Sequence, residues 1–325
     1  MHATHVAGLG LPISQAALGT MTFGDSVDAT GAAAMVDTAL EAGITVVDTA
    51  NVYSGGRCEE LLAPLLSTRR DSVILATKAG IPHEDGGGLP PLSRVALRRS
   101  VHGSLRRLGV ERIDLFYLHQ PDRATPLHET LGTIHELMND GLIGAFGVSN
   151  YAAWQIGELN HVAASIGMSG PAVAQQLCNL VARRVEEEYF EFARVSGLFT
   201  MVYNPLAGGL LTGRHTFTVA PTEGRFAHSD LADTYRDRYW NARMFTAVDS
   251  LAAIAAGAGV SLAELALRWL TGLADVASIL LGASRDEQLR ANIGAITRGP
   301  LPPDVLSACD DVAITLRGPM PSYNR

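Results

Sequence analysis

An aspartate, a tyrosine, a lysine and a histidine are placed where they could together deliver a proton to an oxygen atom. Each lies at or just after the end of a short apolar segment: Asp48 ends 44–48 with Tyr53 in the loop that follows, Lys78 ends 72–78, and His119 ends 114–119. An unperturbed tyrosine has a pKa of about 10, too high for an efficient acid at neutral pH. A nearby Lys78 cation would lower that pKa, and Asp48 would hold Lys78 charged and oriented. A neutral His119 could donate a hydrogen bond to a carbonyl oxygen, so the set predicts polarisation and protonation of a carbonyl.

Taken one at a time, the same four residues have simpler interpretations. Asp48 could cap a loop and Tyr53 could pack with its hydroxyl in solvent, since loops favour such residues. Lys78 could be solvated, although a lysine that ends an apolar strand is costly to desolvate without a partner. His119 could be a hydrogen-bonded structural histidine. Their joint occurrence at the ends of three consecutive strands favours a shared site, because consecutive strands are usually neighbours.

The elements that must position these residues alternate between strand-like and helix-like patterns. We expect eight strands, at 16–19, 44–48, 72–78, 114–119, 142–148, 172–175, 199–203 and 276–281. Helices are expected between them, at 29–42, 59–66, 93–108, 127–139, 151–167 and 185–196, with two more before the last strand and one at 286–297 after it. This alternation predicts an α/β fold, a (β/α)8 TIM barrel, in which the carboxyl ends of the strands form one rim that carries the active site. A doubly wound sheet would also alternate, but no Gly-x-Gly-x-x-Gly follows a strand.

Three further features complete the expected architecture of one domain over residues 1–325. A short hairpin at 6–13 is expected to cap one end of the barrel, and a long loop at 205–242 follows strand seven. A C-terminal tail follows the last barrel helix. Because so long a loop is unusual in a compact domain, we expect it to be a functional insertion.

Composition narrows the class of protein. The chain has 325 residues, 47% of them apolar, and a net charge of −8 with no basic arm, so we expect no nucleic-acid partner. Cys58, Cys178 and Cys309 are far apart and form no CxxC, which predicts neither a disulfide framework nor a cysteine zinc site. We expect no metal, no signal peptide and no membrane span, and therefore a cytoplasmic protein.

The remaining strand ends hold residues that suit a hydride donor, which the four reactive residues lack. They are Ser149, Asn150, Gln175 and Tyr203, followed after strand eight by Gly282, Ser284, Arg285, Gln288 and Asn292. Side-chain amides suit a carboxamide and Tyr203 offers a face for stacking. Ser284 and Arg285 suit a phosphate, and Asn292 suits an adenine edge. Ser284 could equally be a helix N-cap.

At these residues the chain resembles the aldo-keto reductase superfamily over essentially its whole length. The motifs that carry the resemblance are Gly19–Gly24, Asp48–Ala50 with Tyr53–Ser54, Thr77–Lys78, Leu115–His119, Gly147–Asn150 and Asn204–Gly213. By that resemblance Asp48, Tyr53, Lys78 and His119 match the catalytic tetrad, with Tyr53 as general acid and NADPH as hydride donor. It also implies cofactor contacts at Leu206, Gly208 and Arg214.

Within the superfamily the chain resembles the aflatoxin-aldehyde and succinic-semialdehyde reductase branch. The motifs are Phe116–Asp122, Ser149–Trp154, Tyr235–Trp240, Ala266–Trp269 and Pro321–Arg325. This resemblance implies a small carbonyl substrate, including carboxylate-bearing aldehydes, and a homodimer. It implies substrate contacts from Met21, Arg238 and Arg325, although Arg238 could be a surface ion pair and Arg325 a frayed end.

Three residues depart from the family pattern. Cys178 stands where tyrosine is usual before Asn179, which alters the packing expected beneath the cofactor. Ala291 replaces a frequently acidic residue beside Asn292. Arg214 stands where lysine often follows the Leu-Thr-Gly turn, and it keeps the charge but not the geometry at the pyrophosphate.

Two other functions compete with a reductase. A cofactor-binding regulatory subunit, like the potassium-channel β-subunits, would share the fold and much of the tetrad, but we expect an extended N-terminal segment in such a protein. A metal-dependent barrel isomerase would need a cluster of carboxylates and histidines that the rim lacks. Turnover of an aromatic aldehyde with NADPH would separate the first interpretation from both.

Overall fold

The computed structural model describes residues 1–222, 224–227 and 232–318. The chain divides into two compact units. The first comprises Met1–Gln176, Glu191–Met201 and Ala277–Arg290, and the second comprises Leu177–Phe190, Val202–Val276 and Ala291–Arg325. The first unit carries the barrel strands, except for the last residues of two of them. The interpretation of residues 1–325 as a single domain stays a prediction.

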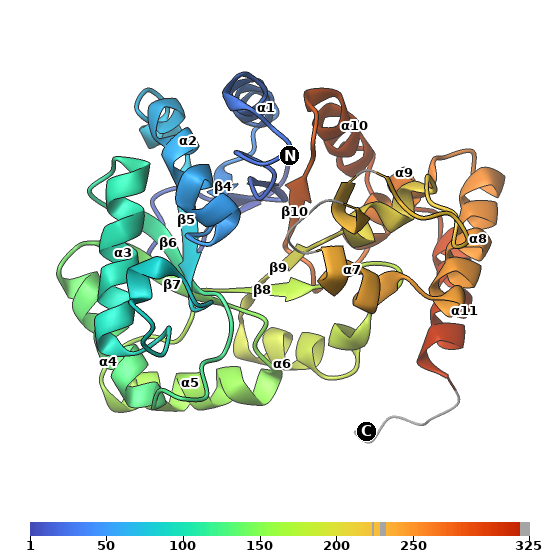
Figure 1. Cartoon of the computed structure of the whole chain (residues 1–325). Helices are drawn as coiled ribbons and strands as arrows, with labels where there is room; N and C mark the ends of the chain where they lie inside the picture. Colours follow the sequence, from blue (N-terminus) through green and yellow to red (C-terminus); the bar gives the residue numbers. More distant parts are fainter. Residues whose placement is uncertain (223, 228–231, 319–325) are drawn as a thin grey trace. The chain divides into compact units, whose positions relative to one another are not determined.

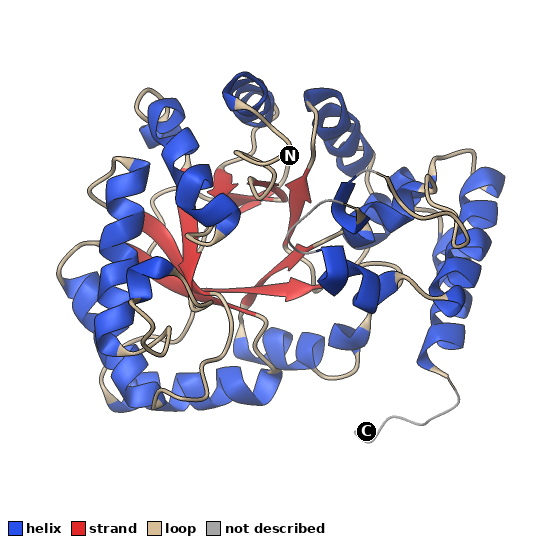
Figure 2. Ribbon diagram, in the orientation of Figure 1, coloured by secondary structure: helices blue, strands red, loops and turns tan. Residues whose placement is uncertain are grey.

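Eight parallel strands close a barrel, which confirms the predicted (β/α)8 fold (Figure 2). In spatial order they are β10 (Ser278–Gly282), β3 (Ala16–Gly19), β4 (Val46–Asp48), β5 (Ile74–Ala79), β6 (Ile113–Leu118), β7 (Ile143–Ser149), β8 (Val173–Leu177) and β9 (Phe199–Tyr203). Sequential strands are neighbours throughout, so residues at the ends of β4, β5 and β6 come together without any crossover.

Helices connect the strands, as the barrel fold requires. They are α1 (Ala29–Glu41), α2 (Arg57–Leu66), α3 (Arg94–Leu108), α4 (Leu127–Asn139), α5 (Ala153–Ser165), α6 (Tyr189–Ser196) and α10 (Asp286–Thr297), and Figure 1 shows α1 to α5 outside the strands. The first of them shows how the sequence sets the bounds. Asp28 caps α1 by accepting a hydrogen bond from the Gly31 backbone at 2.8 Å, and the chain leaves the helix through Gly43, which has a φ of +80°.

The barrel interior explains why the reactive residues share one rim. One apolar cluster draws on successive strands: Ala17, Val46, Ile74, Ala76, Leu115, Tyr117, Ala145, Val173, Phe199 and Met201. Side chains alternate between the two faces of a strand, so every second residue points inward. The next positions on this inward face, two residues further along three of the strands, are Asp48, Lys78 and His119. They continue the packed core at the carboxyl ends of the strands.

An N-terminal hairpin is present, but its two strands flank the expected range 6–13 and share only Ile13 with it. Strand β1 (Ala3–Thr4) pairs antiparallel with β2 (Ile13–Ser14), and residues 5–12 connect the two strands. Val6, Leu9 and Leu11 of this connection pack against the barrel core. The apolar residues at 6–13 therefore serve mainly to cover the barrel interior.

The second unit contains the two helices expected before the last strand, at Ala242–Gly257 and Leu262–Thr271, together with helices that the sequence patterns did not reveal. It holds α7 (Ala232–Tyr239), α8 (Ala242–Gly257), α9 (Leu262–Thr271) and α11 (Pro303–Arg317), with two short 3-10 turns, η5 (Ala207–Thr212) and η6 (Gly224–Phe226). The segment 205–242, expected to be a loop, thus contains η5, η6 and α7, and the tail contains α11. Helix α7 escaped prediction because only Ala232 and Tyr239 are buried, too few to give a visible period.

No single helix in the described part of the chain is long and apolar enough to cross a membrane. The pair α8 and α9 passes that test only when the two are taken together, and they are bent by 87° at the break between them.

Candidate active site

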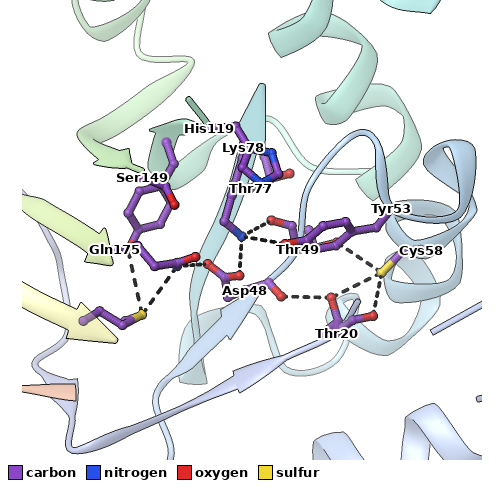
Figure 3. A network of polar contacts seen from close by, with 12 residues as sticks. Thr20, Asp48, Thr49, Tyr53, Cys58, Thr77, Lys78, His119, Ser149 and Gln175 are labelled. Atoms are coloured by element: carbon purple, nitrogen blue, oxygen red, sulfur yellow. Dashed lines mark hydrogen bonds and ion pairs between the residues drawn. The ribbon is translucent and has the colours of Figure 1, made fainter. Parts of the chain in front are cut away.

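Asp48 and Lys78 form a buried ion pair at the rim of the barrel. Their side chains are 1% and 0% exposed, and the Lys78 ammonium contacts the Asp48 carboxylate directly. Lys78 also donates a hydrogen bond to the backbone oxygen of Thr49 at 2.9 Å (Figure 3). Burial alone would lower the pKa of Lys78, but Asp48 and Tyr53 hold that pKa above its ordinary value. The expected pairing is present, and it keeps Lys78 cationic.

Tyr53 is brought to this ion pair by a tight turn after β4. The 3-10 turn η1 (Tyr53–Gly56) includes Ser54 at φ 51°, a left-handed conformation, and Ser54 Oγ donates to the Phe23 backbone oxygen at 3.2 Å. The turn places Tyr53 Oη 3.5 Å from Lys78 Nζ. The phenol therefore contacts a fixed cation, which is the arrangement that favours loss of its proton.

His119 follows β6 directly and packs beside Tyr53. Its backbone N–H donates to the Ala79 oxygen at 2.8 Å, and its ring lies edge-on to Tyr53 with centroids 6.0 Å apart. Burial, and secondarily the Lys78 cation, lowers the pKa of His119 to about 3. The imidazole is therefore neutral near pH 7 and can act as a hydrogen-bond donor. Its Nδ1 has no hydrogen-bond partner among the residues described.

Gln175 holds the second oxygen of Asp48, a contact that sequence reasoning missed. Its Nε2 donates to Asp48 Oδ2 at 2.9 Å and also contacts the sulfur of Met201 at 3.6 Å (Figure 3). Both carboxylate oxygens of Asp48 are thus engaged, one by Lys78 and one by Gln175. The alternation of β8 could have predicted that Gln175 points into the barrel, because Gln175 lies two residues after the inward-facing Val173.

A second buried network, also missed from the sequence, supports the tetrad from outside the barrel. Glu59 on α2 is fully buried; its Oε1 accepts from Thr77 at 2.6 Å and its Oε2 accepts from Arg107 at 2.8 Å. Arg107 reaches on to Asp85 at 2.7 Å. Burial opposes the charge of Asp85, but Arg107 and His83 hold the pKa of Asp85 below its ordinary value. Because Thr77 adjoins Lys78 and α2 follows the Tyr53 turn, this network ties the two segments together.

Ser149 and Asn150 lie beside this site at the end of β7. Ser149 is buried and stands in register with Gln175 on the next strand. Asn150 adopts a φ of 64°, and its Nδ2 donates to the His119 backbone oxygen at 2.9 Å and to Ser149 Oγ at 3.1 Å. The hydroxyl and amide groups expected to suit a carboxamide are therefore grouped with His119 in the first unit.

The residues after β10 form another part of the first unit. Gly282 ends the strand and is exposed, as are Ser284 and Arg285 at the start of α10. The Ser284 hydroxyl donates to Gln288 Oε1 at 3.0 Å, and the Ser284 backbone N–H donates to the same oxygen at 3.2 Å. Ser284 thus joins a side-chain contact at the helix start, while the exposed guanidinium of Arg285 stands next to it. Met21 lies half-buried in the loop after β3.

The second unit holds the other residues expected to contact a cofactor. Leu206 is half-buried and leads into η5, where Gly208 and Gly209 have φ values of 69° and 104°. Arg214 is exposed, yet its guanidinium lies against two glycines: a Cβ at Gly209 would be 3.1 Å from its Nη2, and one at Gly224 would be 2.5 Å away. An exposed guanidinium beside a glycine turn fits an anionic group. The other two residues of this unit that we expect to contact the cofactor are Tyr203, which is half-buried, and Asn292, which is buried.

The other expected residues have less defined surroundings. Arg238 is exposed on α7, with its guanidinium 6.0 Å over the ring of Tyr239, and Arg325 lies outside the described residues. Cys178 is fully buried, and burial raises the pKa of its thiol. Within the described ranges no group of three or more His, Cys, Asp and Glu side chains could hold a metal ion.

Comparison with known proteins agrees with this geometry. The sequence model of the Aldo/keto reductase family matches residues 16–314. The chain is 37% identical over 335 residues to Aflatoxin B1 aldehyde reductase member 2 of Mus musculus, covering 98% of this chain and 90% of the relative, and 38% identical over 323 residues to its Homo sapiens namesake, covering 95% and 89%. It is 34% identical over 321 residues to a probable voltage-gated potassium channel subunit beta of Oryza sativa subsp. japonica, covering 93% and 94%. The chain therefore belongs to the aldo/keto reductase family.

Proposed function

We propose that this protein reduces small aldehydes or ketones to alcohols, with NADPH as hydride donor and Tyr53 as proton donor. The observation that carries the proposal is the buried Asp48–Lys78 ion pair in contact with half-buried Tyr53, beside a His119 whose pKa is lowered to about 3. Such a group suits one chemical event, the stabilisation and protonation of a carbonyl oxygen as negative charge develops on it.

The tetrad residues divide this task between them. Lys78, 3.5 Å from the Tyr53 oxygen, stabilises the phenolate that remains once Tyr53 has given its proton to the carbonyl oxygen. Neutral His119 donates a hydrogen bond to the same substrate oxygen and orients the carbonyl. NADPH, when bound, supplies the hydride that the carbonyl carbon receives. Carbon and oxygen thereby gain one hydrogen each, and Tyr53 regains its proton from water.

Asp48 keeps the lysine cationic. A lysine without its carboxylate at this depth would tend to lose its proton, because burial disfavours the ammonium. Gln175 holds Asp48 Oδ2 at 2.9 Å and so fixes the carboxylate against rotation. We therefore propose that Asp48 and Gln175 keep Lys78 charged. We also propose that Gln175, Ser149 and Asn150 bind the carboxamide of the cofactor.

The remaining cofactor residues fall into two groups, each within one unit. Ser284 and Arg285, with Gln288, suit the phosphate that distinguishes NADPH from NADH. The turn 204–213 and Arg214 suit the pyrophosphate, because Arg214 carries an exposed guanidinium beside the left-handed Gly209 of this turn. Tyr203, Gly282 and Asn292 remain our expected contacts to the rings and ribose.

A carboxylate-bearing aldehyde is the substrate class that we favour. Two relatives are named as aflatoxin B1 aldehyde reductases, so their names point to an aldehyde. Arg238 is an exposed cation on α7, and half-buried Met21 remains the apolar substrate contact that we expect. The net charge of −8 repels an anion at long range, so a local arginine must outweigh it. The homodimer and the cytoplasmic location expected from the sequence stay predictions.

A cofactor-binding channel subunit is the second candidate, because a relative of that name is 34% identical to this chain. The test is NADPH oxidation by the purified protein with 4-nitrobenzaldehyde, with Tyr53→Phe as the matched variant. We expect turnover by the wild type and a loss of roughly 10²–10⁴ in rate in Tyr53→Phe, with the Kd for NADPH unchanged. Binding of NADPH with no turnover of any aldehyde would favour the channel subunit.

A further inference from the structure

Tyr239 is a fully buried tyrosine whose hydroxyl serves two amides. It ends α7, and its oxygen accepts a hydrogen bond from Asn204 Nδ2 at 2.9 Å and from Asn179 Nδ2 at 3.1 Å. Burial raises the pKa of Tyr239, so the hydroxyl stays neutral. A buried hydroxyl with two donors aimed at it holds both partners in place, because either donor would lose a hydrogen bond by moving.

Asn204, the more closely bound of the two partners, begins the turn 204–213 in a left-handed conformation. Its φ is 59°, and Ala207 in the same turn has a φ of 50°. Residues other than glycine are uncommon in the left-handed region, although asparagine enters it more readily than most. Here Asn204 Oδ1 accepts from the Gly208 backbone N–H at 2.6 Å, and its backbone oxygen accepts from Asn179 at 3.0 Å.

Helix α7 also packs directly on this turn. A Cβ added at Gly208 would lie 2.5 Å from Cδ1 of Tyr235, so the ring of Tyr235 occupies the space that a side chain would need. Tyr235 and Tyr239 are one helical turn apart on α7, and their ring centroids are 6.4 Å apart. Two tyrosines of one helix therefore meet the turn, one by ring packing and one by hydrogen bonding.

We propose that Tyr239 is a positioning residue for the phosphates of the cofactor. It fixes the left-handed Asn204, and through Asn204 it holds the conformation of the turn 204–213, where we propose that the pyrophosphate binds. The inference rests on the proposed function, since the pyrophosphate belongs to NADPH. It makes the docking of α7 a determinant of cofactor affinity.

The test compares Tyr239→Phe with Tyr235→Phe, which removes a hydroxyl from the same helix and keeps the ring. Calorimetry measures the Kd of NADP⁺ and of adenosine 2′-monophosphate, a probe that carries the 2′-phosphate but no pyrophosphate. For Tyr239→Phe we expect about tenfold weaker NADP⁺ binding, equivalent to about 1.4 kcal/mol, and an unchanged Kd for the probe. Tyr235→Phe should bind both ligands as the wild type does, and kcat at saturating NADPH should be the same in all three proteins.

A double variant tests the route through Asn204. Glycine adopts a φ of 59° without strain, so Asn204→Gly keeps the backbone but removes both side-chain contacts. We expect Asn204→Gly to weaken NADP⁺ and not the probe, and we expect Tyr239→Phe to add little in that background. If Tyr239→Phe fails to fold, Asn204→Gly still tests the inference, because an unchanged Kd for NADP⁺ in that variant overturns it.

The outcomes separate this inference from the proposed function. A wild type that binds no NADP⁺ overturns both. A wild type that binds NADP⁺ with the same Kd as Tyr239→Phe overturns the role of Tyr239 alone. Equal weakening of NADP⁺ and of the probe would mean a general loosening of the protein, which also contradicts a role at the pyrophosphate.

Discussion

His119 should make the stability of this protein fall with acid, because the folded state keeps its imidazole neutral. The pKa of His119 is lowered from 6.5 to about 3 in the folded protein, while the unfolded chain keeps the ordinary value. Between about pH 6.5 and about pH 3, His119 is therefore protonated in the unfolded state and neutral in the folded state. The stabilisation is complete above the unfolded pKa and is lost progressively as pH falls toward the folded pKa.

The size of the effect follows from the width of that window. Each pH unit between the two pKa values changes the unfolding free energy by about 1.4 kcal/mol, so about 2 kcal/mol is lost by about pH 5. His119→Asn removes the titrating group but leaves a polar side chain. For a chain of 325 residues, about 2 kcal/mol corresponds to a shift of about 3 °C in Tm.

The assay is calorimetric Tm of wild type and His119→Asn at about pH 7.5 and about pH 5, the range in which an ordinary histidine titrates. From the higher to the lower pH, the Tm of the wild type should fall by about 3 °C more than the Tm of His119→Asn. His161→Asn, at an exposed position on α5, is the control for adding asparagine elsewhere. If wild type and His119→Asn lose stability in parallel, His119 is not held neutral and its role as a neutral donor fails.

Three other changes test separate parts of the structure. Arg285→Ala should weaken NADPH binding by about 1.5–3 kcal/mol, measured as a higher KM for NADPH, and should scarcely alter KM for NADH. Equal effects on both cofactors would mean that Arg285 does not bind the 2′-phosphate. Arg107→Met should lower the unfolding free energy in urea by about 3–5 kcal/mol, because it leaves Glu59 and Asp85 buried without their cation, and a loss below about 1 kcal/mol would contradict the network. Arg238→Ala should abolish a lower KM for succinic semialdehyde than for butanal while leaving butanal reduction intact, and a wild type without that preference rules out an anion site.

The tetrad was predictable because its residues repeat the period of the strands that carry them. Lys78 and His119 lie two residues beyond inward-facing apolar residues of β5 and β6, and consecutive strands of a barrel are neighbours. Tyr53 stands only five residues from Asp48, so any turn after β4 keeps it near the rim. Short spacing along the chain and the alternation of side chains on a strand therefore make the positions of these residues predictable from the sequence.

The contacts that were missed join residues far apart in the chain. Gln175 and Asp48 are separated by 127 residues, and Arg107 and Glu59 by 48. No local pattern marks which glutamine or arginine turns toward which carboxylate, since that choice depends on packing across the barrel and between helices.

The second unit was the hardest part to predict for a related reason. Helix α7 buries two residues in eight, and the turn before it depends on left-handed residues rather than on an apolar period. Its fold is set by contacts such as those of Tyr239, which only a structure reveals. Arg325, a predicted substrate contact, lies outside the described residues and stays a prediction.

The central claim, hydride transfer from NADPH with protonation by Tyr53, can be tested in one isotopic measurement. NADPH deuterated at the transferable position of C4 is mixed with 4-nitrobenzaldehyde and either the wild type or Tyr53→Phe, and the alcohol is examined by mass spectrometry. We expect one deuterium in the alcohol made by the wild type, and almost no alcohol from Tyr53→Phe despite unchanged NADPH binding. Unlabelled alcohol from the wild type, or labelled alcohol formed as fast by Tyr53→Phe, would contradict the claim.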